Sequence, residues 1–299
     1  MKLAAVRSFL EIVSLESFSK AALSLHYAHS TVTAQIKSLE SELGEQLFYR
    51  DNKTVVISEA GKRFLPYARQ LIDLEKDAKL ATHDSPVLHG QLKIAAVETV
   101  STYRLPIWLK KLRTEAPDIK ISFQVMRDQE ILESVRTGTL DFGFMVEEKI
   151  QVKDIEVNKL YQEKVSLYAH PKNPLTKKNK VTAKDLSKQF HLLWSLGCSY
   201  SNVFNDLMQK AGYHDFRYME FSNTESMKQC VLENIGIATL TDITVAKEVL
   251  EGKIKRLNFD FPQRFNSMML TNTHRRNRPL IQYFRELICN DISMTKKLV

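Results

Sequence analysis

The stretch that most constrains the fold is SKAALSLHYAHSTVTAQIKSLESELG, residues 19–44. Its second half carries apolar residues at positions i, i+4, i+7 and i+11 and ends at a glycine: Val32, Ile36, Leu39, Leu43 and Gly44. This spacing predicts a helix with one apolar face that stops at Gly44. Ahead of it, Ser19 is a predicted N-cap for a short helix whose alanines permit close packing. We therefore expect two helices joined by a tight turn.

Regular patterns also flank this pair of helices. Apolar residues recur at steps of three and four in Leu3, Val6, Leu10 and Val13, which predicts a preceding helix. Residues 47–57 have the pattern of a strand, a turn and a strand, with Asp51 and Asn52 at the tip and Arg50 and Lys53 beside it. A basic hairpin after a helix-turn-helix is the arrangement of a winged DNA-binding domain.

The polar face of the helix at residues 29–43 is made of short side chains. Such side chains let a helix backbone come close to the major groove, and hydroxyl and amide groups can reach base edges there. The candidate DNA contacts are Ser19, His29, Ser30, Thr31, Thr33, Gln35 and Lys37 in the helices and Arg50 and Lys53 in the hairpin. A solvated face of an ordinary surface helix remains the alternative.

The net charge of the chain does not locate the candidate DNA-binding surface. The 299 residues, 43% hydrophobic and 26% charged, have the composition of a globular protein with room for two or three domains. Residues 1–90 hold eleven basic and eleven acidic side chains, so the net charge of +8 lies in residues 91–299. Residues 20–39, however, contain two lysines and no acid, as a phosphate-facing surface requires. The lysines at 153–188 are expected to form a solvated surface.

A set of residues at fixed spacing carries a family resemblance. It comprises Phe9, Ser17 to Ala22, Leu25, Val32, Thr33, Gln35, Ile36, Leu39, Glu40, Glu42 to Gly44, Leu47, Phe48, Arg50 and Ser58 to Gly61. This set resembles the winged-helix head of LysR-type transcriptional regulators. The resemblance implies sequence-specific binding of double-stranded DNA under the control of a small-molecule effector. It also implies assembly with further copies, as a dimer or tetramer, and contact with RNA polymerase.

A second apolar stripe follows the hairpin. Ser58 is the predicted cap of a helix carrying Leu65, Ala68, Leu71 and Ile72 on one side. A single winged domain would leave this stripe uncovered, and the resemblance implies that it pairs with its copy in a second subunit. Packing back on its own domain remains open. The expected divisions are a DNA-binding domain at 1–58, a linker helix and hinge at 59–90, and an effector domain at 91–299.

Strand and helix patterns alternate through residues 91–299. Apolar runs at 92–97 and 140–146 and the alternating run at 119–125 are separated by helical segments at 103–115 and 129–137. The same rhythm restarts at residue 165, which predicts an α/β fold with two units built on parallel sheets. The resemblance implies a two-lobed, periplasmic-binding-protein-like (type 2) domain, with lobe I at 91–161 and 267–299 and lobe II at 162–266.

Polar residues stand where these strands end, the place at which open α/β sheets bind ligands. The resemblance maps effector contacts onto Thr99, Ser101, Asp128, Gln129, Cys198, Ser199 and Thr224. Taken singly, each fits a plain helix cap better than a ligand contact, and the resemblance is what brings them together in one cleft. Hydroxyls and helix N-termini suit an anion, whereas Asp128 favours an amine or a hydroxyl-rich ligand. We therefore expect a small polar metabolite, with a zwitterion among the candidates.

Signatures of other functions are missing from the sequence. It has no G-x-S-x-G, P-loop, H-E-x-x-H or strand-linked G-x-G-x-x-G motif, so we expect no enzyme activity and no cofactor. His26 and His29 lack a third ligand, so no metal is expected. Three cysteines without C-x-x-C spacing indicate no disulfide framework, and a redox role for Cys198 or Cys230 stays open.

The N-terminal segment bears on location. Arg7, Glu11 and Glu16 interrupt any signal-peptide core, and no segment reaches the length of a membrane span, so we expect a cytoplasmic protein without membrane contact. A solute-binding receptor and a DNA-processing enzyme with a winged domain are the alternative functions.

Overall fold

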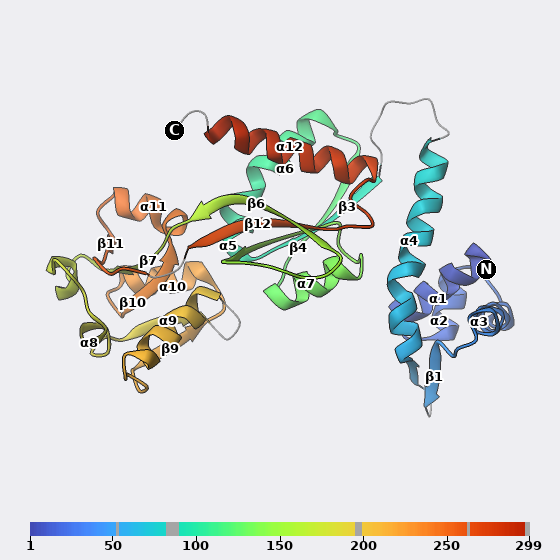
Figure 1. Cartoon of the computed structure of the whole chain (residues 1–299), viewed down its shortest axis with the longest axis horizontal. Coiled ribbons are helices and arrows are strands. Elements are labelled where there is room, and N and C mark those ends of the chain that lie inside the picture. The colour runs from blue at the N-terminus through green and yellow to red at the C-terminus, as the bar shows by residue number, and fades with distance from the viewer. Residues whose placement is uncertain (52–53, 82–89, 195–198, 262–263, 297–299) are drawn as a thin grey trace. The chain divides into compact units, whose positions relative to one another are not determined.

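The computed structural model describes residues 1–51, 54–81, 90–194, 199–261 and 264–296 (Figure 1). The chain divides into two compact units. The first comprises residues 1–87 with the short segments 136–139 and 274–278, and the second comprises 88–135, 140–273 and 279–299.

The first unit is a helix-turn-helix followed by a hairpin and a long helix. Its elements are α1 (Leu3–Leu15), α2 (Phe18–Ser24), α3 (His29–Leu43), β1 (Phe48–Asp51), β2 (Thr54–Ile57) and α4 (Glu59–Ala81). The predicted apolar faces meet in one core, where Phe9, Val32 and Ile36 are almost completely buried. The ring of Phe9 lies 5.3 Å from that of Phe48, so the hairpin is packed onto α1.

Three local predictions in this unit were wrong: the cap of α2, the place of Leu43 on the buried face of α3, and the place of Asp51 at the tip of the hairpin. The cap of α2 is Ser17, whose Oγ accepts a hydrogen bond from the Lys20 amide at 3.3 Å, whereas Ser19 is exposed within the helix. Phe18 is buried in the core as the first residue of α2, so the residue before it, Ser17, is the cap. Leu43 is 40% exposed, although Gly44 ends α3 in a left-handed conformation as predicted. Asp51 pairs with Thr54 across the hairpin, so it belongs to a strand and not to the tip.

Helix α4 is capped as predicted, because the Ser58 Oγ accepts a hydrogen bond from the Gly61 amide at 2.9 Å. The expectation that its apolar stripe lacks a partner in its own chain was wrong. Ala68 and Ile72 are buried in the same core as Phe9, because α1 offers an apolar face to them. Among the side chains of α4 that the structure describes, the large apolar ones left exposed are instead Tyr67 (61%) and Leu74 (66%).

The second unit contains two five-stranded sheets, each the centre of one lobe (Figure 1). Lobe I has the strand order β4-β3-β5-β12-β6. Its strands are β3 (Gly90–Ala96), β4 (Ile119–Val125), β5 (Phe142–Glu147), β6 (Ile155–Glu163) and β12 (Phe265–Asn272). Its helices are α5 (Glu98–Tyr103), α6 (Leu105–Glu115), α7 (Asp128–Arg136) and α12 (Pro279–Lys296). Trp108, Phe144 and Phe284 fill its core.

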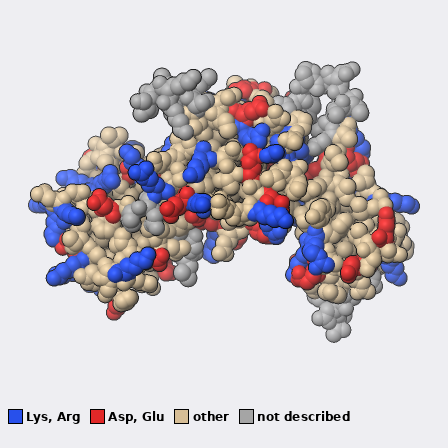
Figure 2. Space-filling view, viewed as in Figure 1, with Lys and Arg blue, Asp and Glu red and all other residues tan. Residues whose placement is uncertain are grey.

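Lobe II has the strand order β11-β7-β10-β8-β9. Its strands are β7 (Val165–Ala169), β8 (His191–Trp194), β9 (Tyr218–Phe221), β10 (Ile237–Thr241) and β11 (Lys255–Arg256). Its helical segments are η1 (Pro174–Lys177), α8 (Ala183–Leu186), α9 (Ser199–Lys210), α10 (Thr224–Leu232) and α11 (Asp242–Leu250). Lysine and arginine side chains are interspersed with acids on the face shown in Figure 2, in keeping with a solvated surface.

The prediction of purely parallel sheets was wrong. β3 runs parallel to β4 and β5, but β12 runs antiparallel to both β5 and β6. In lobe II, β10 is likewise parallel to β8 and antiparallel to β7. The sheets are mixed because β6 and β12, which carry the chain out of lobe I and back, both remain in its sheet. They end at Glu163 and begin at Phe265, two residues from the expected lobe boundaries.

The crossing between the lobes is tied to the end of α5. Glu163 is 4% exposed and accepts hydrogen bonds from the Ser267 hydroxyl (2.9 Å) and from the Arg104 guanidinium (3.1 and 3.2 Å). Arg104 stands between α5 and α6, so the single helix predicted at 103–115 begins only after it, and a separate helix, α5, precedes it. This anchor fixes the end of α5 to the strands that join the lobes.

Candidate functional site

The predicted recognition face lies on the outside of the first unit. Ser19 on α2 and His29, Ser30, Thr31 and Lys37 on α3 are exposed. The Thr33 hydroxyl donates to the His29 carbonyl one turn earlier, at 3.0 Å.

Gln35 is held in a specific orientation. It is half-buried, and its Oε1 accepts a hydrogen bond of 2.5 Å from the fully buried Ser8 on α1. Its amide NH2 is therefore the end that can donate to a base. Of the hairpin candidates, Arg50 belongs to β1, while its side chain and all of Lys53 lie outside the described residues.

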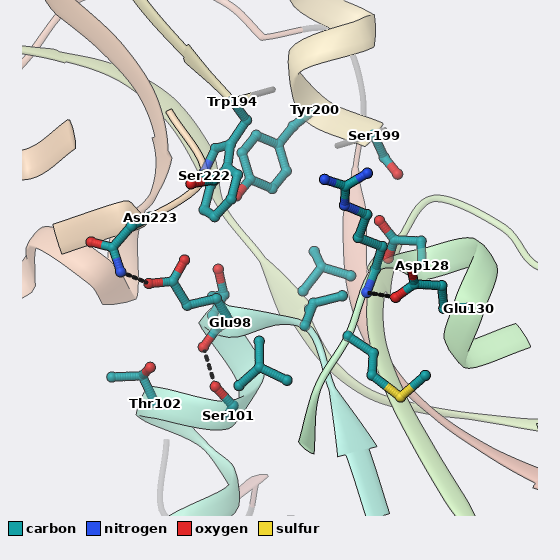
Figure 3. Close-up of a pocket in the computed structure, with 16 residues that line it drawn as sticks. Glu98, Ser101, Thr102, Asp128, Glu130, Trp194, Ser199, Tyr200, Ser222 and Asn223 are labelled. Atoms are coloured by element: carbon teal, nitrogen blue, oxygen red, sulfur yellow. Dashed lines mark hydrogen bonds between the residues drawn. The ribbon is translucent and has the colours of Figure 1, made fainter. Parts of the chain in front are cut away.

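A cleft of about 650 Å³ lies between the two lobes of the second unit, within the range of about 300–1,000 Å³ typical of small-molecule sites (Figure 3). Four of the effector contacts that the resemblance implies line it: Thr99, Ser101, Asp128 and Ser199. The other lining residues are Val97, Glu98, Thr102, Val125, Met126, Arg127, Glu130, Val146, Trp194, Tyr200, Ser222 and Asn223.

The remaining candidates fall elsewhere. Gln129 is exposed and is not among the lining residues, because it follows Asp128 on the outer side of α7. Thr224 is 3% exposed and lies behind the lining. Cys198 lies outside the described residues. Cys230 is free and half-buried, and Cys289 is free and exposed.

Glu98, the first residue of α5 in lobe I, caps α10 of lobe II. Its carboxylate accepts hydrogen bonds from the Thr224 amide (3.0 and 3.1 Å), the Thr224 hydroxyl (3.0 Å) and the Asn223 side-chain amide (3.1 Å). The Asn223 Oδ1 in turn accepts from the Ser226 amide at 2.8 Å. Thr224 therefore belongs to the site through its bonds to Glu98, and the N-terminus of α10 is occupied by a carboxylate of the same chain.

A pair of carboxylates, Asp128 and Glu147, stands on the lobe I side of the cleft. Burial, and then the negative charge of Glu147 at the end of β5, raise the pKa of Asp128 to about 7. The Asp128 Oδ1 is buried and has no hydrogen-bond partner among the described residues. Glu147 itself accepts a hydrogen bond from the Ser199 hydroxyl across the cleft.

Aromatic side chains form the lobe II wall. Trp194 ends β8 and Tyr200 lies in the first turn of α9, where Figure 3 shows their rings side by side. The Trp194 indole Nε1 is buried without an acceptor among the described residues. The sequence analysis missed Glu98, Glu147 and both aromatic residues as site residues. The strand-end rule could have found the two acids, whereas nothing in the sequence separates these aromatic residues from core residues.

Neither a metal cluster nor a membrane-spanning helix is present in the described part of the chain. It contains no group of three or more His, Cys, Asp or Glu side chains placed to hold a metal ion. None of its helices has both the length and the apolar character to cross a membrane.

Comparison with known proteins accounts for both units. Residues 3–62 match the family of bacterial regulatory helix-turn-helix proteins of the lysR type, and residues 86–291 match the LysR substrate binding domain. The chain therefore belongs to the LysR family of transcriptional regulators. It is a DNA-binding regulator with an effector-binding domain and not an enzyme, which sets aside both alternative functions.

Individual relatives are similar along most of the chain. It is 35% identical over 260 residues to the uncharacterized HTH-type transcriptional regulator YwqM of Bacillus subtilis, covering 87% of this chain and 88% of the relative. The fold resembles ArgP of Mycobacterium tuberculosis (20% identity, TM-score 0.79, 97% and 96% coverage). It also resembles LysG of Corynebacterium glutamicum, solved with its effector Arg bound (18% identity, TM-score 0.74, 98% and 99% coverage).

Proposed function

We propose that this regulator reads an operator through the exposed face of α3 and the basic hairpin, and that a small polar metabolite in the interlobe cleft controls that binding. The observation that carries the proposal is the cleft itself, which is lined by polar groups of both lobes. A ligand that contacts both lobes shifts the balance between their arrangements by its difference in affinity for each.

The DNA contacts follow from side-chain position. The proposed base-reading groups are Thr31, which is exposed on α3, and Thr33 and Gln35, which are half-buried at the two sides of its apolar face. The proposed phosphate contacts are Ser19, His29, Ser30, Lys37, Arg50 and Lys53. Basic and hydroxyl side chains at the edge of such a face fix its register on the duplex.

The proposed effector contacts are Thr99, Ser101, Asp128 and Ser199, with Thr224 acting through Glu98. The structure of LysG with bound Arg shows that a fold of this kind can hold an amino acid. The cleft volume of about 650 Å³ suits a molecule of that size.

Assembly follows from the linker helix. Exposed Tyr67 and Leu74 lie seven residues apart on α4, which places them on one face of the helix. We propose that this face joins two subunits, so that two α3 helices reach two half-sites, with a tetramer as the larger form. Contact with RNA polymerase and a cytoplasmic location complete the proposal.

The experiment is a binding titration of the full chain on its own promoter DNA and on a scrambled duplex. Thr33→Ala is expected to reduce the discrimination between the two by about 1–3 kcal/mol, because a lost base contact affects the operator alone. Ser14→Ala, which removes an exposed hydroxyl on α1, is the matched control. Full discrimination by the Thr33 variant would mean that another face of the head reads DNA.

The effector half of the proposal is tested by footprinting with a ligand found by thermal-shift screening. Thr99→Val and Ser199→Ala each remove one hydroxyl from opposite walls of the cleft and should abolish or blunt the ligand's effect on the footprint. An unchanged response in both variants would place the effector site elsewhere.

A further inference from the structure

The cleft carries more acid than base. Glu98, Asp128 and Glu130 line it, and Glu147 stands beside Asp128, whereas Arg127 supplies the basic side chain of the lining. Figure 3 shows the labelled acids distributed over the lobe I side of the cleft, facing Trp194 and Tyr200. An excess of like charge in a partly desolvated cleft repels an anionic ligand and attracts a cationic one.

Two of the groups that would hold an anion are already engaged. Helix N-termini attract negative charge through their unpaired amides, and here Glu98 accepts hydrogen bonds from the amide and hydroxyl of Thr224 at the start of α10. The Ser199 hydroxyl at the start of α9 donates to Glu147. A carboxylate ligand would have to displace Glu98 and then lie beside it.

Other groups of the cleft favour a cation. The Asp128 Oδ1 is a buried acceptor that lacks a donor among the described residues, and a buried polar atom left unpaired is costly. Trp194 and Tyr200 across the cleft can stack on a cation. The Trp194 indole N–H is a buried donor that lacks an acceptor in the same described set.

From this pattern we propose that the effector carries a cationic nitrogen, an ammonium or guanidinium group, that binds Asp128, together with an acceptor atom for the Trp194 indole. Glu98 acts as a built-in anion that occupies α10 and excludes ligands bearing negative charge alone. The inference rests on the proposed function, in which the effector occupies this cleft, and adds the chemical class of ligand and the residues that select it.

The first test measures the thermal shift of the full chain at pH 8 with two sets of probes at 5 mM. One set contains the common amino acids, and the other contains the carboxylic acids of the same carbon skeletons without the amino group. At least one amine-bearing probe is expected to raise the melting temperature, and its deaminated partner is not. Stabilisation by carboxylic acids alone, or by no amine-bearing probe, would overturn the inference.

The second test assigns the cation to Asp128 by calorimetry with the stabilising probe. Asp128→Asn keeps the shape of the side chain and removes its charge, so the dissociation constant should rise about tenfold or more. Asp118→Asn is the matched control, because Asp118 is an exposed acid of the same lobe outside the cleft lining. Equal affinity in both variants would remove Asp128 from the site.

The third test asks whether Glu98 fills an anion position. Glu98→Ala frees the Thr224 amide and hydroxyl, so sodium acetate should restore part of the lost melting temperature. Glu233→Ala removes an exposed carboxylate at the other end of α10 and should show no rescue. Acetate that stabilises neither variant, or both equally, would contradict the role of Glu98.

The outcomes separate this inference from the proposed function. A carboxylic acid whose stabilising effect is lost in Thr99→Val would keep the interlobe effector site and refute the cationic class. A probe of either class whose effect persists in both Thr99→Val and Ser199→Ala would refute the site itself.

Discussion

The DNA-binding head and the effector cleft depend on different interactions. In the head, the buried side of α3 holds the polar face in position. That side consists of Val32, Ile36 and Leu39, which are at most 2% exposed and lie within eight residues of one helix. The cleft collects its polar groups from α5 and α7 in lobe I and from α9 and α10 in lobe II, and pairs them across the lobes by charge and hydrogen bonds. The head should therefore be sensitive to lost volume, and the cleft to changed charge.

The largest expected effect is on the core of the head. Phe9 is fully buried and its ring contacts those of Phe48 and Phe64, so Phe9→Ala should lower the stability of the head by about 3–5 kcal/mol. Scanning calorimetry of the full chain should show the head unfolding at lower temperature while the effector unit keeps its own transition. Leu23→Ala, at a side chain 76% exposed on α2, should change little. A single transition that shifts as a whole would contradict the contrast between independent units.

A smaller effect is expected at the surface of the linker helix. Tyr67→Glu combined with Leu74→Glu puts charge on its exposed apolar face and should raise the dimer dissociation constant about a hundredfold, equivalent to about 2.7 kcal/mol. Sedimentation velocity of the full chain across a concentration series measures this. Ile72→Ala, at a side chain buried against α1, should instead lower the melting temperature of the head with little effect on assembly. Dissociation by Ile72→Ala and not by the double variant would reverse the roles of the two faces.

The head was the more predictable region because its order is local. Apolar spacing within single helices predicted α1 and α3, and Gly44 and Ser58 were correctly read as helix ends. The errors arose where tertiary packing decided the outcome. Burial of Phe18 chose Ser17 over Ser19 as the cap, and the apolar face of α1 covered Ala68 and Ile72.

The cleft was predictable only in part. The resemblance mapped Thr99, Asp128 and Ser199 onto one cleft, and all three line it. It could not show that Glu98 bonds to Thr224, because these residues are 126 positions apart in the sequence and meet only when the lobes are folded. Such pairings decide which helix N-termini remain free for a ligand. The charge of the ligand therefore could not be predicted from the strand ends alone.

The smallest expected effect concerns charge in the cleft and its dependence on pH. Burial and the facing Glu147 of β5 raise the pKa of Asp128 from 3.8 to about 7 in the folded protein, with Glu130 of α7 a further acid of the same lining. Between these two values the folded state holds more protons than the unfolded state, so this group's contribution to stability is greatest below pH 4 and is lost as pH rises to about 7. Asp128→Asn stays neutral throughout, so we expect it to match the wild type below pH 4 and to exceed it at pH 8 by about 1 kcal/mol in urea unfolding, a value limited by solvent screening in the open cleft. A cationic ligand favours the ionised carboxylate, so its affinity should rise from pH 6 to pH 8 in the wild type and stay flat in the variant. Asp118→Asn is the reference variant. If the stability curves of Asp128→Asn and wild type run parallel from pH 5 to pH 8, Asp128 is as well solvated as an exposed acid. That result would contradict the expectation that the cleft is sensitive to changed charge.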